Sequence, residues 1–336
     1  MKIAEVIGKQ ARDDQILHLR KQVEQLENVN QALRVRLGEQ KEIAQAISDA
    51  IHAAEPAKPQ KYQRAPRPGS PVAAVLKFSD WHTGAVIDPN ATEGFGAYNW
   101  KIEQQHFWFI VEKFLAWIDT QRHGYRIDEL HVFGEGDYIS GDIHEDLRRT
   151  NEFPAPVQTA NAGLLLGTAL ERFAKHFRKV RFIGVGADNH GRTTVKPIFK
   201  QKAQTNLSYL VHCIARTYVR RLDNIEFIEA EGMKYLATVA GRKFLIEHGD
   251  TVKTWMGIPY YGLERAQGRE ARRRMNTDRG FDYQSIAHWH VGGIVARNII
   301  INSSLSGTDE LDHAAGRHAP PGQVAFLVHP KHGILN

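Results

Sequence analysis

Cysteine is almost absent from this chain. Among 336 residues, only Cys213 carries a thiol. A single cysteine cannot form a disulfide framework within the chain or a cysteine-rich zinc module. A metal ion bound here would therefore need histidine, aspartate, glutamate or asparagine as ligands. Histidine is well supplied, with 17 residues.

Long apolar runs are also missing. Charged residues interrupt each short apolar stretch of the N-terminal sequence MKIAEVIGKQARDD, so it lacks the core of a signal peptide. No run reaches the ~18 apolar residues of a membrane-spanning helix. We therefore expect a cytoplasmic protein without a membrane partner. A net charge of +6 favours polyanionic partners, although many cytosolic enzymes carry a similar excess.

The first segment, residues 1–54, has a heptad pattern. Its a positions are Ile16, Val23, Asn30, Leu37, Ala44 and Ile51. Its d positions are Leu19, Leu26, Leu33, Gln40 and Ile47. β-Branched residues at a, Leu at d and one Asn at a are typical of parallel dimers. The pattern predicts a coiled coil that forms a homodimer or a higher oligomer; the alternative is an amphipathic helix that packs on its own globular domain.

Residues 55–71 read EPAKPQKYQRAPRPGSP and contain five prolines among basic residues. Such a composition predicts a stiff, extended linker. The linker separates the helical segment from one large domain, residues 72–336.

In this domain, β-rich apolar runs alternate with amphipathic ones. The predicted strands are Val72–Phe78, Glu129–Phe133, Val180–Val185, Glu226–Ala230, Met233–Val239, Lys243–Glu247 and Val324–Val328. The predicted helices are Asn99–Gln121, Ala155–His176 and Phe199–Arg221. The early alternation indicates an α/β (α+β) domain with parallel pairing, and the later strands indicate mixed or antiparallel pairing.

Metal-binding residue types follow five apparent strand ends, four of which belong to the strands predicted above. In the stretch KFSDWHTG, Asp80 and His82 follow the first predicted strand. On an extended strand, residues two apart point to the same side, so this pair could hold one metal ion. It could equally be a strand end that turns polar at the surface. The other motifs are GEGD, ADNH, EHGD and AHWH, which contain Asp137, Asn189, His190, His248, His288 and His290.

Asp-x-His, Gly-Asp, Asn-His, His-Gly and His-x-His, in this order, resemble the calcineurin-like metallophosphoesterase superfamily. The resemblance runs from about residue 74 to 293, and its specificity lies in order and spacing. It implies a two-layer β-sandwich flanked by helices, with two closely spaced divalent metal ions. Oxygen and imidazole ligands suit manganese, which we expect, or iron or zinc.

The resemblance also assigns the residues. One ion would be held by Asp80, His82, Asp137 and His290. The second would be held by Asp137, Asn189, His248 and His288, with Asp137 as the bridge. His190 would be the catalytic acid on the leaving-group side, because imidazole titrates near neutral pH.

Four departures from the family pattern are visible. Asp188 and Ala287 stand where the family usually has glycine, and Gly191 stands where an acid is common. The residues after Asp137 also lack the Asp-Arg-Gly of the protein phosphatases, which argues against a phosphoprotein substrate. None of these departures removes an expected ligand.

An arginine-rich segment between His248 and His288 bears on the substrate. Its cations Arg269, Arg272, Arg273 and Arg274 could neutralise phosphates, and Tyr260 and Tyr261 could stack on unpaired bases. The alternative is a solvated helix in which Glu264 and Glu270 pair with some of the arginines. Together with the basic linker, the segment favours DNA as the partner and a DNA phosphodiesterase, similar to the repair exonucleases and phage-encoded phosphoesterases of the superfamily. A small-molecule phosphatase or cyclic-nucleotide phosphodiesterase, or a scaffold without activity, are the alternatives.

Overall fold

The computed structural model describes residues 20–28, 30–31, 34–35, 38, 41–42, 45, 49, 56–58, 69–253 and 259–335. The chain divides into two units, Met1–Asp49 and Ala50–Asn336. Among the described residues, no helix combines the length and the apolar character that crossing a lipid bilayer requires.

The described residues of the first unit are helical, as the heptads predict. Val23 and Leu26, two heptad core positions, are 53% and 63% exposed. The heptad positions that lie outside the described residues are Ile16, Leu19, Leu33, Leu37, Gln40, Ala44, Ile47 and Ile51. The coiled coil therefore stays a prediction, and so does most of the linker. Ser70, at the end of the expected linker, is already the first residue of a strand. It pairs with Tyr125, which begins the next strand of the same sheet.

The second unit contains two β-sheets. The first sheet has the order β11-β10-β1-β2-β3-β4, and the second has the order β5-β6-β7-β9-β8. The strands of the first sheet are β1 (Ser70–Phe78), β2 (Tyr125–Gly134), β3 (Lys179–Gly184), β4 (Ile225–Glu229), β10 (Ala325–His329) and β11 (Gly333–Leu335). Those of the second are β5 (Lys234–Val239), β6 (Arg242–Glu247), β7 (Tyr283–Ile286), β8 (Gly293–Val295) and β9 (Ile299–Ile301).

Strand direction places the carboxyl ends together. In the first sheet, β1 to β4 are parallel and β10 is antiparallel to β1. In the second sheet, β6, β7 and β9 are parallel, whereas β5 and β8 pair antiparallel with their neighbours. The expected parallel pairing of the early strands and mixed pairing of the later ones are confirmed.

The two sheets pack face to face as a sandwich. Alternate residues of β1 point to opposite faces, so Ala73 and Val75 face the second sheet while Phe78 faces away from it. The core between the sheets includes Val75, Phe133, Phe244 and Ile300, all buried. The expected two-layer sandwich is therefore present.

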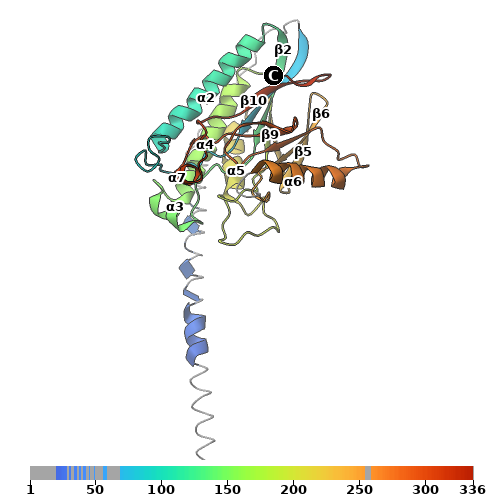
Figure 1. Cartoon of the computed structure of the whole chain (residues 1–336). Coiled ribbons are helices and arrows are strands. Elements are labelled where there is room, and N and C mark those ends of the chain that lie inside the picture. Colours follow the sequence, from blue (N-terminus) through green and yellow to red (C-terminus); the bar gives the residue numbers. More distant parts are fainter. Residues whose placement is uncertain are drawn as a thin grey trace, which may run out of the picture. The chain divides into compact units, whose positions relative to one another are not determined.

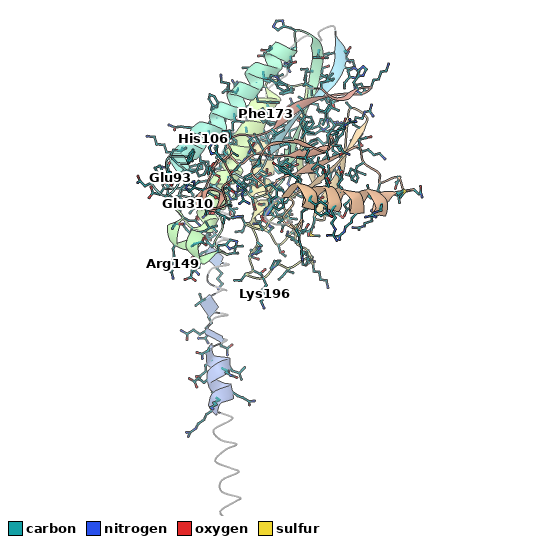
Figure 2. The ribbon with its side chains drawn as sticks, viewed as in Figure 1. Glu93, His106, Arg149, Phe173, Lys196 and Glu310 are labelled. Carbon is teal, nitrogen blue, oxygen red and sulfur yellow. The ribbon has the colours of Figure 1, made fainter. Side chains whose placement is uncertain are left out.

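Helices cover the outer faces of the sandwich (Figure 1). The helices are α2 (Trp100–Gln121), α3 (Glu145–Thr150), α4 (Ala155–Ala174), α5 (Leu207–Val219), α6 (Pro259–Arg274) and α7 (Glu310–Ala314). Phe78 packs against Phe107 of α2 and Phe173 of α4, which Figure 2 labels, with ring centroids 5.6 and 6.0 Å apart. On the second sheet, Leu263 of α6 packs on Ile286 and neighbouring isoleucines.

One predicted helix was wrong in its first turns. The sequence predicts a helix over Phe199–Arg221, but α5 begins only at Leu207. Asn206 caps it, because its side-chain oxygen accepts a hydrogen bond from the backbone N–H of Ser208 at 2.9 Å. Residues 192–205 before this cap form an irregular loop.

Candidate metal centre

The loops after five strands meet at one edge of the sandwich. They follow β1, β2 and β3 in the first sheet and β6 and β7 in the second. Carboxyl ends of parallel strands lie at the same edge, which is where loops of α/β sheets collect ligands. These loops carry all the expected ligands, namely Asp80, His82, Asp137, Asn189, His248, His288 and His290.

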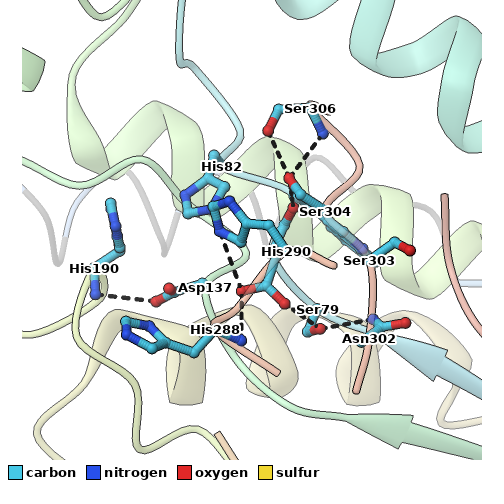
Figure 3. A network of polar contacts seen from close by, with 12 residues as sticks. Ser79, His82, Asp137, His190, His288, His290, Asn302, Ser303, Ser304 and Ser306 are labelled. Carbon is cyan, nitrogen blue, oxygen red and sulfur yellow. Dashed lines mark hydrogen bonds and ion pairs between the residues drawn. The ribbon is translucent and has the colours of Figure 1, made fainter. Parts of the chain in front are cut away.

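The first group of ligand atoms belongs to Asp80, His82 and His290, and these atoms lie within 4.8 Å of one another. The Nε2 atoms of His82 and His290 are 3.1 Å apart, and Nε2 of His290 is 3.7 Å from Oδ1 of Asp80. Figure 3 shows the two imidazoles facing each other. Two ring nitrogens and a carboxylate oxygen that converge in this way are a candidate set of ligands for a cation.

The second group consists of Asp137, His248 and His288. Nε2 of His248 lies 3.1 Å from Oδ2 of Asp137 and 2.9 Å from Oδ1 of Asn189. Asp137 also groups with His82 and His190, so its carboxylate lies between the two sets. The geometry thus places Asp137 where a bridging ligand would be needed.

Hydrogen bonds at Nδ1 orient three imidazoles. Nδ1 of His248 is 2.7 Å from the backbone oxygen of Glu135, and Nδ1 of His190 is 2.8 Å from that of Ser140. A carbonyl oxygen can only accept, so Nδ1 carries the proton in both rings. Nδ1 of His290 lies 3.1 Å from Oδ2 of Asp312. Each Nε2 is left facing the centre, the arrangement found in metal-binding histidines.

The pKa values of the two imidazoles in the second group are displaced in opposite directions. Burial disfavours charge on His248, but the carboxylate of Asp137 raises the pKa of this imidazole well above its usual range. Burial and the neighbouring His248 lower the pKa of His288 to about 3, so this imidazole is neutral, as metal binding requires.

The carboxylates of the site are held by neighbouring donors. Oδ2 of Asp80 accepts from the Ser79 hydroxyl at 2.6 Å, and its Oδ1 accepts from the backbone N–H of His288 at 3.1 Å. Oδ1 of Asp137 accepts from the backbone N–H of His190 at 3.0 Å. Oδ2 of Asp137 is buried and has Nε2 of His248 as its neighbour at 3.1 Å.

The backbone at the site is left-handed. The φ angles are 53° at Asp80 and at His82, 50° at Asp137, 71° at His288 and 60° at His290. Such angles are uncommon outside glycine. The prediction that Asp80 and His82 share a side because they lie on an extended strand was therefore wrong in its reason. β1 ends at Phe78, and the left-handed turns after it bring both side chains into the first group.

Two glycines allow the loops to approach closely, as the small residues of the motifs suggested. A Cβ on Gly136 would lie 2.6 Å from Oδ2 of Asp188, and one on Gly141 would lie 2.2 Å from the backbone oxygen of His190. Both glycines have positive φ, so a side chain there would also strain the backbone.

A cavity of about 460 Å³ opens over the two groups. His190 and His144 line it, with their ring centroids 5.8 Å apart, so His144 does lie at the site. Trp289 also lines the cavity, whereas Trp81 is buried in the core beside Phe78. Apolar residues form part of the cavity wall, namely Ala85, Val86, Ile87, Leu147, Trp289 and Leu311.

Several residues that form hydrogen bonds to the candidate site residues were not predicted from the sequence. Asp312 comes from the five-residue helix α7, far from any motif, and Ser79 and Ser140 act through common hydroxyl and backbone groups. Lys77 and Glu135 form an ion pair buried beneath the ligands. Lys77 lies in an otherwise apolar run of the sequence, and this unusual position is the feature from which a buried ion pair could have been predicted.

The arginine-rich segment forms α6 on the outer face of the second sheet. Arg274 pairs with Glu270 at 3.0 Å, and Lys234 pairs with the same carboxylate at 3.1 Å, which agrees with the solvated-helix alternative at these positions. The other candidate substrate-binding residues are exposed, namely Tyr260, Tyr261, Arg269, Arg272 and Arg273. The described cavity lining includes none of them.

No protein-family model and no curated protein sequence matches the chain. Among solved structures, Vps29 from Entamoeba histolytica, complexed with Zn²⁺, is 13% identical (TM-score 0.29) and covers 75% of this chain and 84% of its own. Vacuolar protein sorting 29 from Cryptosporidium parvum is 12% identical (TM-score 0.31) and covers 77% and 87%. An archaeal phosphodiesterase is 9% identical (TM-score 0.29) and covers 69% and 85%. At such low similarity, the function has to be argued from the residues of the site.

Proposed function

We propose that this chain is a phosphoester hydrolase of the calcineurin-like metallophosphoesterase superfamily that works with two divalent metal ions, and that it cleaves DNA phosphodiesters. The observation that carries the proposal is the two neighbouring ligand groups, which are linked because Asp137 of the second group also lies close to His82 of the first. One ion would be held by Asp80, His82, Asp137 and His290. The other would be held by Asp137, Asn189, His248 and His288. Manganese is the expected metal, with iron or zinc as alternatives, since thiolates are missing from the set.

Bound ions of this kind supply a hydroxide near neutral pH and stabilise charge on phosphoryl oxygens. The chain's own residues set the geometry of the reaction. His190 lines the cavity and donates from Nδ1 to the backbone oxygen of Ser140, which leaves Nε2 as the atom for the proposed proton transfer to the leaving oxygen. His144 beside it adds a second imidazole to the same wall.

The choice of DNA is supported by charge. The net charge of +6 and the exposed arginines of α6 favour a polyanion. We infer in addition that the N-terminal heptads join copies of the chain, because Val23 and Leu26 are exposed in the described helix. Light scattering after size-exclusion chromatography would show a monomer if this inference is wrong.

A small-molecule phosphatase or cyclic-nucleotide phosphodiesterase is the second candidate. The cavity of about 460 Å³ is within the size range of small-ligand pockets, and part of its wall is apolar. A scaffold without activity is disfavoured, because it would not need the full ligand set.

One assay separates these functions. The protein, supplied with Mn²⁺, is given bis-p-nitrophenyl phosphate, p-nitrophenyl phosphate, and end-labelled single- and double-stranded DNA at low and moderate salt. Cleavage of the diester and of DNA that is lost with EDTA and weakened by salt supports a nuclease. Turnover of the monoester alone would instead indicate a phosphatase, and no turnover of any substrate would contradict the proposal.

A further inference from the structure

The loop of residues 192–200, which starts two residues after His190, exposes large apolar side chains. Val195 is 72% exposed, Ile198 50% and Phe199 64%. Single exposed apolar residues are common, but a cluster of three within five residues marks an interaction surface.

The same loop is strongly basic. Arg192, Lys196 and Lys200 lie in it, and no carboxylate occurs between Asp188 and Asp223 in the sequence. Lys196 and Lys200 are exposed, and Figure 2 shows Lys196 at the periphery of the molecule. Cations interleaved with apolar side chains are typical of surfaces that bind single-stranded nucleic acid, where phosphates meet lysines and bases stack on aromatic rings.

The base of the loop is fixed. Arg192 and Asn206 pair across it, and Asn206 donates to the backbone oxygen of Asp188 at 3.1 Å. The buried ammonium of Lys202 lies 2.5 Å from Oδ2 of Asp250. Asp188 in turn accepts from the backbone N–H of Gly191 at 2.7 Å. The exposed part of the loop therefore projects from the same rigid segment that carries the candidate ligand Asn189.

We propose that the 192–200 loop binds single-stranded nucleic acid on the His190 side of the metal centre, with Phe199 stacking on a base and Lys196 and Lys200 contacting phosphates. This inference rests on the proposed phosphodiesterase function. A strand whose phosphodiester lies at the two ligand groups has to leave the cavity. The loop starts two residues after His190, which lines the cavity, and it offers positive charge next in the chain to that wall, although residues 192–200 are not among the described lining residues. A lipid surface would need the same kinds of side chain, but it would give the loop no reason to adjoin His190.

The test uses the full-length, Mn²⁺-loaded protein. Binding of a fluorescein-labelled, phosphorothioate-backbone oligothymidylate, which resists cleavage, is followed by anisotropy across a series of salt concentrations. Phe199→Ala should weaken binding about five- to 100-fold. Lys196→Gln/Lys200→Gln should lower the slope of log affinity against log salt by about 1.4, since each single-strand phosphate contact contributes roughly 0.7. Turnover of bis-p-nitrophenyl phosphate should stay unchanged in both variants.

Arg269→Gln/Arg272→Gln on α6 is the matched control, because it removes the same number of exposed cations. If this variant loses binding while both loop variants keep it, the strand lies on α6 and the inference is overturned. Wild-type protein that turns over the diester but binds no oligothymidylate also overturns it. If Phe199→Ala loses binding to anionic phospholipid vesicles but still binds oligothymidylate, the loop binds a membrane and the inference is overturned. Failure of diester turnover in the wild type contradicts the proposed function instead, whatever the loop binds.

Discussion

The ammonium of Lys77 lies 3.2 Å from the carboxylate of Glu135, and both side chains are fully buried between the two sheets. Lys77 also donates to the backbone oxygens of Ile286 at 2.9 Å and Ile300 at 2.7 Å, in β7 and β9. Glu135 lies two residues before Asp137, and its backbone oxygen accepts a hydrogen bond from Nδ1 of His248. This pair therefore joins the sheet that supplies Asp137 to the sheet that supplies the C-terminal histidines.

Lys77→Met should lower the free energy of unfolding by about 3–5 kcal/mol, because it leaves the Glu135 carboxylate buried without its partner. Urea denaturation measures the change. Lys179→Met is the control, since Lys179 is 38% exposed and lies 2.7 Å from Glu226. An exposed pair of this kind contributes less than about 1 kcal/mol. Equal losses in both variants would show that the buried pair has no special role.

Asp137→Asn and His248→Ala should abolish Mn²⁺-dependent hydrolysis while the far-ultraviolet circular dichroism stays that of the wild type. Each removes a proposed direct ligand, so the loss should exceed the roughly 10–100-fold that removal of an outer partner causes. His332→Ala, at an exposed histidine away from the strand-end motifs, is the control and should keep full activity. Retained turnover in either ligand variant would rule out the two-metal assignment.

Asp312→Asn should weaken the apparent affinity for Mn²⁺ about 10- to 100-fold, because it removes the charge that orients and polarises His290. Activity measured over a range of Mn²⁺ concentrations gives this affinity. Glu310→Gln, in the same short helix, should leave it unchanged. If excess Mn²⁺ does not rescue Asp312→Asn, the carboxylate acts in some other way.

Glu103 gives a prediction about pH. This side chain of α2 is fully buried, accepts a hydrogen bond from the Thr83 hydroxyl, and burial raises its pKa well above the ordinary value of 4.5. The folded protein thus keeps a proton that the unfolded chain loses above that pH. The stability from Glu103 is therefore present in acid and lost as pH rises. Glu103→Gln cannot ionise, so its stability relative to the wild type should increase with pH, by at most about 1.4 kcal/mol per unit.

Urea denaturation at several pH values tests this trend. Glu112→Gln on the same helix is the control with the opposite sign. A hydrogen bond from Arg172 lowers the pKa of Glu112, so its stabilisation exists above the ordinary pKa and that variant should lose a little stability there. Parallel pH curves for wild type and Glu103→Gln would mean that folding does not raise the pKa of Glu103.

The strands that bear ligands could mostly be predicted because they are apolar runs ended by polar motifs. β7 could not, since half of it is polar. Gln284 and Ser285 are buried there and donate to Glu247 of the neighbouring strand β6 and to Glu135, which follows β2 in the other sheet. β9 is three isoleucines, too short to stand out. The role of Asp312 could not be predicted either, because its partner His290 is 22 residues away in the sequence.

The helix predicted to start at Phe199 failed for a physical reason as well. Phe199 has helical spacing with the buried Ala203 and Leu207, but in the structure it is exposed in a loop before the helix begins. Periodicity identifies apolar residues that share a side; it does not say whether anything packs against that side. The exposed loop is thus a place where local pattern and tertiary structure disagree.

The left-handed turns at the candidate ligands lower the stability of the fold while they position side chains for metal binding. A non-glycine residue in this conformation costs on the order of 1 kcal/mol, and five ligand positions share it. Glycine would relieve the backbone at each of them and remove a ligand at the same time. Selection for thermal stability alone, without selection for turnover, would therefore favour glycine at these turns. Each such substitution would remove one candidate ligand from the centre.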